Sequence, residues 1–218
     1  MLRLLMLSTA AAFCAAPAAA QTWTAAPTAA EMAAAFPEKA KAQGVGGAVD
    51  LVCTAARDGS LEDCAVLGEQ PRNLGFGPAA RRLVEQKLRV AGVTKGQEIQ
   101  IPVTFSGDLA KGAAFTVKTP VWAALPTVGD MQSAVPKTEG GPNNVRVTLV
   151  CDVLAGGSLA GCTVDREEPA GQGFGPAILA LASKFQVALM SAEGMPTVGA
   201  KVRVPVRFDL KPVEQAAQ

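Results

Sequence analysis

An internal repeat with a period of about 98 residues constrains this sequence more than any other feature. The run GFGPA from Gly75 to Ala79 recurs unchanged from Gly173 to Ala177, and a tryptophan, several prolines and a cysteine pair recur in the same order around it. Self-similarity at a fixed period indicates duplicated structural units. We therefore predict two homologous modules, residues 22–106 and 121–210, with a linker at 107–120 and a polar tail at 211–218.

Composition excludes most classes of enzyme. The chain has 218 residues, of which 49% are hydrophobic and 18% charged, and it contains no His. Without imidazole there is no Ser–His or Cys–His nucleophile pair, and no His-ligated zinc or haem. No serine stands in a G-x-S-x-G elbow, and the acids Glu62 and Asp63 of the first module are Ala160 and Gly161 in the second. We predict a protein that is not an enzyme and that holds no cofactor and no metal.

The first twenty residues resemble an export signal. Arg3 supplies a positive start, an apolar stretch runs from Leu4 to Cys14, and the small residues at 18–20 fit a cleavage site before Gln21. We predict a cleaved signal peptide at 1–20; a retained membrane anchor and a lipid attached at Cys14 are the alternatives. Basic and acidic residues number 20 and 19. Removing Arg3 leaves 19 minus 19, or zero, so we expect no binding to nucleic acid.

Four cysteines remain after this leader, in two C-x10-C pairs: Cys53 with Cys64, and Cys151 with Cys162. Each pair flanks a turn, at Asp58-Gly59 in the first module and at 156–157 in the second. If each turn has two residues, the cysteines lie directly opposite at about 5.5 Å between Cα atoms, and a disulfide can join them. A three-residue turn with a glycine bulge would break that register. Two intramodular disulfides are predicted, with free buried thiols as the alternative.

Each module is predicted to be α+β, in the order β-β-α-β behind a short leading helix. Thr28 with Glu31, and Thr127 with Asp130, have the spacing of a helix cap. The cysteine hairpin follows. After it, the proline of each GFGPA run stands at the first turn of a longer helix. Strict alternation then predicts a last strand, from Ile99 to Phe105 and from Val202 to Phe208. One helix covering one face of a small antiparallel sheet is the expected architecture.

The last strands are the candidate binding sites. Pro102 and Pro205 lack an N–H group, which predicts that both strands lie at a sheet edge or are locally unpaired on that side. An exposed edge can take up an extended peptide through main-chain hydrogen bonds. The candidate residues are Ile99, Ile101, Val103 and Phe105 in the first module, and Val202, Val204, Val206 and Phe208 in the second.

The hairpin with Asp-Gly at its turn, the run FGPAARRLV and the segment G-x-x-I-x-I-P-V-T-F together resemble the C-terminal domain of TonB energy transducers. The resemblance covers residues 37–105 and, in the second copy, 136–208. It implies a periplasmic domain that contacts outer-membrane transporters by adding strand to strand. The cysteine pair resembles a variant of the family found in exported bacterial proteins.

Because the chain has no His and no Pro-rich spacer, we expect the binding module, rather than the whole energy transducer, to carry over from the family. The leading hypothesis is a periplasmic interaction protein whose partner lies in the cell envelope. The alternatives are a structural envelope protein whose two edge strands pair with each other, and an anchored transducer that retains residues 4–20.

Overall fold

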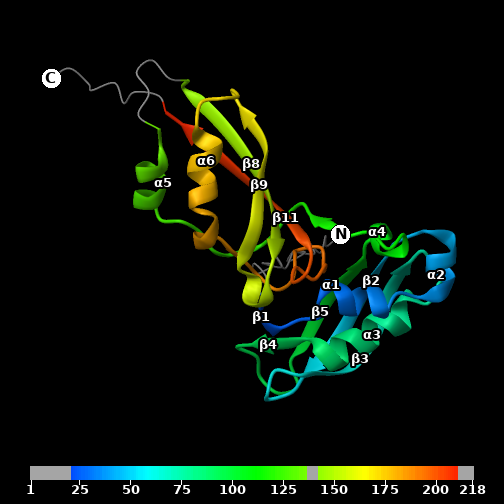
Figure 1. Cartoon of the computed structure of the whole chain (residues 1–218). Helices are drawn as coiled ribbons and strands as arrows, with labels where there is room; N and C mark the ends of the chain where they lie inside the picture. The colour runs from blue at the N-terminus through cyan, green and yellow to red at the C-terminus, as the bar shows by residue number, and fades with distance from the viewer. Residues whose placement is uncertain (1–20, 137–141, 211–218) are drawn as a thin grey trace, which may run out of the picture.

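The computed structural model describes residues 21–136 and 142–210. The signal peptide predicted at 1–20 and the tail predicted at 211–218 lie outside the described residues. The described chain is α+β, as predicted, and forms two units joined by a short connecting segment (Figure 1). No helix in the described ranges is long and apolar enough to cross a membrane.

Module 1 contains a three-stranded antiparallel sheet in the order β3-β2-β5, covered by helix α3. Two short helices precede the sheet, and a two-stranded ribbon, β1 with β4, lies beside it. The elements of this module are β1 (Thr22–Ala25), α1 (Ala29–Ala34), α2 (Glu38–Gln43), β2 (Gly47–Ala55), β3 (Leu61–Gln70), α3 (Phe76–Lys87), β4 (Arg89–Ala91) and β5 (Glu98–Phe105).

Module 2 repeats this plan, with helix α6 over strands β8 and β9. Its sheet has the order β6-β11-β8-β9, and β10 pairs with β7 in a second ribbon. The elements are β7 (Trp122–Ala124), α5 (Val128–Ala134), β8 (Asn144–Val153), η1 (Ala155–Gly157), β9 (Leu159–Glu168), α6 (Phe174–Ala180), η2 (Ala182–Lys184), β10 (Gln186–Val187) and β11 (Lys201–Asp209). The segment at 107–120 contains helix α4 (Gly107–Ala110) and strand β6 (Thr116–Val117), which pairs in parallel with the start of β11.

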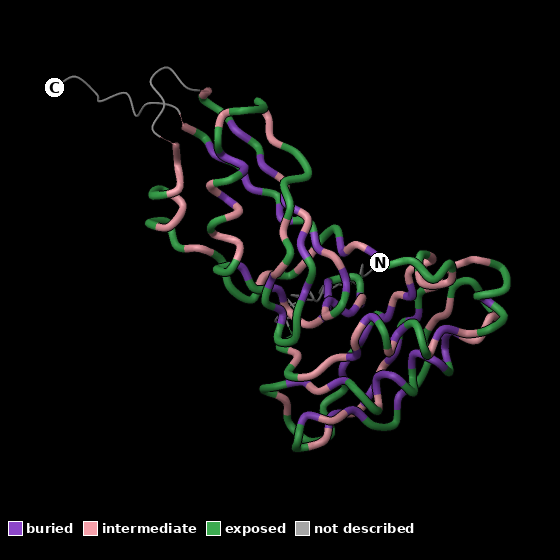
Figure 2. The backbone as a smooth tube through the Cα atoms, viewed as in Figure 1, coloured by how far each residue is buried: buried purple, intermediate pink, exposed green. Residues whose placement is uncertain are grey.

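Each module has its own hydrophobic core, formed where strand and helix residues with the expected periodicity meet (Figure 2). Phe76 and Phe174, which begin α3 and α6, are fully buried. Phe76 packs against Phe36 and Phe105, whereas Phe174 packs against Phe208. Burial of large aromatic side chains contributes strongly to a small core. Helix α6 is shorter than α3 and passes into the single turn η2.

The leading helices begin as predicted. Thr28 and Thr127 each accept a hydrogen bond from the backbone of the third helical residue, while the carboxylates of Glu31 and Asp130 accept from the backbone N–H of the cap. The ion pair Lys87–Glu31, at 2.7 Å, joins α1 to the end of α3. The ion pair Lys184–Asp130, at 2.6 Å, joins α5 to η2, which follows α6.

The acids that stand two residues before a proline in each module are helix caps. Glu69 accepts hydrogen bonds from the backbone N–H groups of Gly75 and Phe76, at 3.2 and 3.1 Å. Glu167 accepts from Phe174 at 2.9 Å. Because these N–H groups have no partner within their own helix, a carboxylate there satisfies them, and its negative charge interacts favourably with the positive end of the helix dipole. The two acids therefore join the hairpin to the helix in both modules.

The hairpin turns differ from the two-residue turns that the sequence argument assumed. In module 1, Ala56 donates to the Ser60 carbonyl at 2.9 Å and Gly59 donates to the Ala56 carbonyl at 3.1 Å, which leaves three residues in the loop. The same pattern joins Leu154 to Ser158 in module 2, at 2.8 Å. Three-residue loops need a left-handed residue at their end. Gly59, with a φ of 80°, meets this need, so the predicted turn type was wrong.

A second irregularity restores the cysteine register. Asp63 has a φ of 51° and Gly161 a φ of 57°, and each lies at a register shift just before the second cysteine of its hairpin. One extra residue in a strand, a β-bulge, moves the following residues by one position. The bulge cancels the extra residue in the turn, so Cys64 and Cys162 still come opposite their partners.

Candidate binding site at the two sheet edges

Strand β5 is an edge of the module 1 sheet, as its proline predicted. It pairs with β2 on one side, with Ile101 opposite Leu51 and Pro102 opposite Asp50. In an antiparallel pair, the N–H groups of alternate residues point toward and away from the neighbour. The Ala55 N–H donates to Gln97 O, whereas the Thr104 N–H donates to Gly194 O on the side away from β2. These two hydrogen bonds show which alternate residues of β5 face β2. The N–H groups of Gln100 and Thr104 therefore point outward.

Strand β11 lies between β6 and β8, so the predicted edge position was wrong for the start of this strand and holds only beyond β6, where Pro205 lies. Its backbone N–H groups alternate in direction as those of β5 do. It pairs with β8 from Lys201 opposite Asp152 to Asp209 opposite Asn144. The N–H of Lys201 donates to the Phe115 carbonyl at 3.1 Å, on the side away from β8. By this alternation the outward N–H groups after Lys201 are those of Arg203, at the end of the part paired with β6, and of Arg207 and Asp209, with Pro205 carrying none.

The eight residues predicted for binding are placed on these two strands, but their side chains are buried in the two cores. Their N–H groups point toward β2 and β8 by the same alternation. Contact with a partner would therefore use the outward backbone groups and the side chains of the intervening residues. Sequence alternation had marked the core face of each strand, and the binding role of these strands stays a prediction. The intervening residues are Glu98, Gln100, Pro102 and Thr104 in β5, and Lys201, Arg203, Pro205, Arg207 and Asp209 in β11.

Module 2 has about five extra residues between its main helix and its last strand, because the offset between the copies grows from 98 at Gly75 and Gly173 to 103 at Phe105 and Phe208. These extra residues lie against the edge of module 1. We call residues 190–198 the docking loop. Thr104 donates its backbone N–H to Gly194 O at 3.0 Å and its hydroxyl to Glu193 O at 2.6 Å. The Thr119 hydroxyl donates to the Glu193 carboxylate, which lowers the pKa of that carboxyl. Within the described residues, β5 and β11 do not pair with each other.

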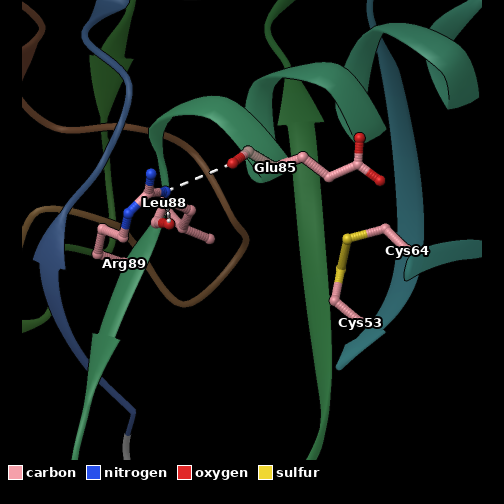
Figure 3. The surroundings of a disulfide bond; sticks show 5 residues. All are labelled: Cys53, Cys64, Glu85, Leu88 and Arg89. Carbon is pink, nitrogen blue, oxygen red and sulfur yellow. Dashed lines mark hydrogen bonds between the residues drawn. A yellow bond between two sulfur atoms is a disulfide. The ribbon is translucent and has the colours of Figure 1, made fainter. Parts of the chain in front are cut away.

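Both predicted disulfides are present. The Cα atoms are 4.1 Å apart for Cys53–Cys64 and 4.0 Å apart for Cys151–Cys162. In module 1 the bridge lies close to the last turns of α3, where Arg89 donates to the carbonyls of Glu85 and Leu88 at 3.4 and 2.7 Å (Figure 3). Carbonyls at a helix end have no partner within the helix, so the guanidinium acts as a cap. The bridge joins β2 to β3 near the turn of the hairpin.

The described residues contain no group of three or more His, Cys, Asp or Glu side chains that could hold a metal ion. Trp23 and Trp122, the tryptophans of the repeat, are partly buried against the cores of their own modules. The pocket of about 430 Å³ lined by Trp23, Pro102, Met190 and Gly194 lies between the edge of β5 and the docking loop. The chemistry offered by both edges is hydrogen bonding of an extended chain.

Comparison with known proteins agrees with this architecture. The family described as the Gram-negative bacterial TonB protein C-terminal matches residues 32–107. The chain belongs to this TonB C-terminal family. A protein of Caulobacter vibrioides described as uncharacterized is 32% identical over 99 residues, which is 45% of this chain and 98% of that protein. The family match runs from within α1 to just past β5 and includes the Cys53–Cys64 hairpin. The TonB C-terminal family consists of non-enzymatic domains of the cell envelope that act through protein–protein contact.

Sequence reasoning missed three parts of this site. The ribbons β1–β4 and β7–β10 are short, and their strands lack an alternating pattern long enough to see. The offset between the copies reveals an insertion around residues 190–197, but no local signal tells where an insertion packs. The one available signal was glycine: Gly194 has a φ of 75°, a conformation that favours glycine strongly.

Proposed function

We propose that this protein is a periplasmic, non-enzymatic interaction protein that binds an extended segment of an envelope protein by strand addition. The single observation that carries the proposal is the backbone left open on the last strands, along β5 at the edge of its sheet and along β11 beyond its short pairing with β6, in a chain of the TonB C-terminal family. An unpaired edge offers a row of backbone donors and acceptors that an extended peptide can satisfy. An outer-membrane transporter is the partner class that the family resemblance favours.

Two further parts of the proposal concern the whole chain. Residues 121–210 form a second TonB C-terminal-like module, supported by the repeated GFGPA run, capping acid and disulfide hairpin. Residues 1–20 direct export and are removed, which is consistent with two disulfides in the remaining chain. Sequencing the N-terminus of the mature protein from a periplasmic fraction tests the second part. A retained leader in the membrane fraction would contradict it.

The test of strand addition is capture from a solubilised outer-membrane fraction by the immobilised mature protein. Gln100→Pro and Arg207→Pro each remove an outward backbone donor, and the ring also obstructs an added strand. Gln100→Ala and Arg207→Ala are the matched controls, because they change the side chain and keep the N–H group. Loss of a captured protein with a proline variant, and retention with the matching alanine variant, supports the proposal. Equal capture by both proline variants, with native circular dichroism, contradicts it.

A structural role in the envelope is the second candidate, because the docking loop already covers part of β5. Thr104 uses both its backbone N–H and its hydroxyl on this loop. A protein whose edges are satisfied within the chain would capture nothing in the experiment above. It would still fold with both disulfides formed.

A further inference from the structure

We propose that the two edges have different roles: β11 is the docking strand and takes an extended acidic peptide, whereas the docking loop closes β5 within the chain. This inference rests on the proposed function, strand addition, and specifies the edge and the charge of the partner. Three observations carry it: the contacts of the docking loop, the uncovered part of β11, and the arginines beside that part.

The docking loop follows the outer edge of β5 at backbone distance. Thr104 donates to Gly194 O and Glu193 O. A Cβ atom added to Gly194 would lie 1.8 Å from the Pro102 carbonyl oxygen and 2.8 Å from the Val103 nitrogen. Such contact leaves no room for a side chain, so only glycine fits there. The backbone at 194 occupies the space beside β5 that an added strand would need.

Burial and hydrogen bonds hold the docking loop in place. Met190 is buried and joins the core of module 1 although it belongs to module 2. Inside the loop, Ser191 donates its N–H to Met195 O at 2.8 Å, and the buried Thr197 hydroxyl donates to Ala188 O at 2.7 Å. Farther along, the Ala29 N–H donates to Val198 O at 2.8 Å. Burial of Met190 and these hydrogen bonds stabilise closure, since each satisfies or removes from water a group of the loop.

The corresponding strand of module 2 is open over most of its length. Strand β6 pairs only with Lys201 and Val202. From Arg203 to Asp209, no strand of the described chain pairs with β11 on the side away from β8. Arg203, Pro205, Arg207 and Asp209 are all exposed there. An extended peptide of about four residues could therefore add beside this part of β11.

The solvent face beside the open edge is basic. Arg207 lies directly opposite Arg146 across the β11–β8 pair, and both are exposed. Like charges at opposed positions of a sheet are unfavourable. Neither guanidinium forms an ion pair within the described residues, and Arg203 lies 3.4 Å from Asp165. The nearby acids are Asp209 at the strand end and Glu168, which lies opposite Arg146 across the β8–β9 pair and forms its ion pair with Arg166.

Module 1 lacks this charge pattern. The residues that correspond to Arg203 and Arg207 are Gln100 and Thr104, and Ala48 corresponds to Arg146. An acidic side chain on an added strand would relieve the repulsion between the two opposed arginines of module 2 and would find no cation in the same place in module 1. The charge of the partner is thus complementary to one edge only.

The experiment measures binding of three fluorescein-labelled octapeptides to the purified mature protein by fluorescence anisotropy. The peptides alternate valine with glutamate, glutamine or lysine. The variants are Arg203→Gln with Arg207→Thr, which places the module 1 residues in β11, together with Arg207→Pro and Gln100→Pro. Gly194→Val is added to expel the docking loop, and circular dichroism checks the fold of each variant.

We expect the glutamate peptide to bind the wild-type protein. Its affinity for the variant with both arginines replaced should be about fivefold lower, because two exposed ion pairs are lost. Arg207→Pro should abolish this binding and Gln100→Pro should leave it unchanged. Raising the salt concentration should weaken it because exposed charges are screened. Gly194→Val should add a second site that takes the glutamine peptide and is lost with Gln100→Pro.

The inference is overturned if the glutamate and lysine peptides bind equally, if the double arginine replacement has no effect, or if Gln100→Pro rather than Arg207→Pro abolishes binding. Failure of the glutamate peptide to bind the wild-type protein also overturns it. In these cases strand addition itself is judged by the capture experiment. If no proline variant alters either peptide binding or capture, the proposed function falls as well.

Discussion

Module 1 is held to its neighbour along β5, whereas module 2 keeps most of the corresponding strand uncovered. The insertion that causes this difference, about five residues, contacts the other module instead of its own sheet. A chain with two homologous edges risks pairing through either of them. Covering one edge with a loop removes that risk and leaves a single strand for a partner.

The two hydrophobic cores also differ, and module 1 again has the more extensive contacts. Module 1 places three aromatic rings around the start of α3 and adds Met190 from the other module. Module 2 has one ring pair at the start of α6, and its helix ends after seven residues. We infer that module 1 is the more stable unit and that module 2, with the open edge, is the less constrained one.

Removing the aromatic side chain at the start of each main helix should have the largest effect. Phe76→Ala and Phe174→Ala should each destabilise by about 3–5 kcal/mol, because a fully buried ring leaves a cavity. The loss should be larger for Phe76, which contacts two other rings. Urea unfolding in single-tryptophan backgrounds, with Trp23 or Trp122 as the reporter, measures each module separately. Leu67→Ala is the control, since that side chain is 60% exposed.

Deleting each disulfide is expected to have the second-largest effect. Cys53→Ser with Cys64→Ser, and Cys151→Ser with Cys162→Ser, should each cost about 2–3 kcal/mol, since each bridge closes a short loop. Cys53 and Cys64 are both buried, whereas Cys162 is partly exposed, so the larger loss belongs to module 1. Thermal unfolding gives the size of the effect. Peptide mapping without reductant should find both bridges within modules, and a bridge between modules would contradict the structure.

The bulge position sharpens the comparison further, because module 1 has Asp63 where module 2 has Gly161. Both residues have a positive φ, which an aspartate adopts at a cost and a glycine does not. Asp63→Gly should stabilise by about 0.5–1 kcal/mol, and Gly161→Asp should destabilise by about 1 kcal/mol. Equal effects of one sign in both hairpins would show that the positive φ at the bulge does not decide the effect of these substitutions. Urea unfolding of the matched pair is the measurement.

Lowering the pH should produce the smallest difference in stability, which comes from the leading helices. The Lys184 ammonium, with the hydroxyl and backbone of Thr127, lowers the pKa of Asp130 from 3.8 to about 2. Because the folded pKa is the lower one, this stabilisation is present above about pH 4 and is lost as the pH falls through about 2. With Asp130→Asn, the free energy of unfolding of module 2 should therefore depend less on pH in this window. An unchanged pH dependence of Trp122 fluorescence would contradict the role of this ion pair.

The cysteine pairing shows how far the sequence alone could lead. The pairing was correct, yet the assumed turn was one residue too short, and the error was cancelled by a bulge that nothing in a single copy reveals. Comparing the copies would have helped, since Asp63 and Gly161 align and both residue types tolerate a left-handed backbone. The caps of α1 and α5 were predictable because they depend on residues three apart.

Features that depend on distant contacts were not predictable. The sequence does not identify Glu69 and Glu167 as caps, because the helix N-terminus that each one caps is six or seven residues away and becomes adjacent only in the fold. The docking loop is a stronger case, since its partner Thr104 precedes Glu193 by 89 residues. Local pattern fixes which face of β5 and β11 enters the core, but only tertiary packing decides whether the edge is covered.

The continuous ladder between β11 and β8 has a mechanical consequence. A segment bound beside β11 and pulled along the strand would load the hydrogen bonds of the nine paired residues in shear, so that they resist together. The pull would then pass to β8, which lies between β11 and β9. There the Cys151–Cys162 bridge joins β8 to β9 covalently. Tension at the open edge would thus be shared by three strands before any one of them could peel away.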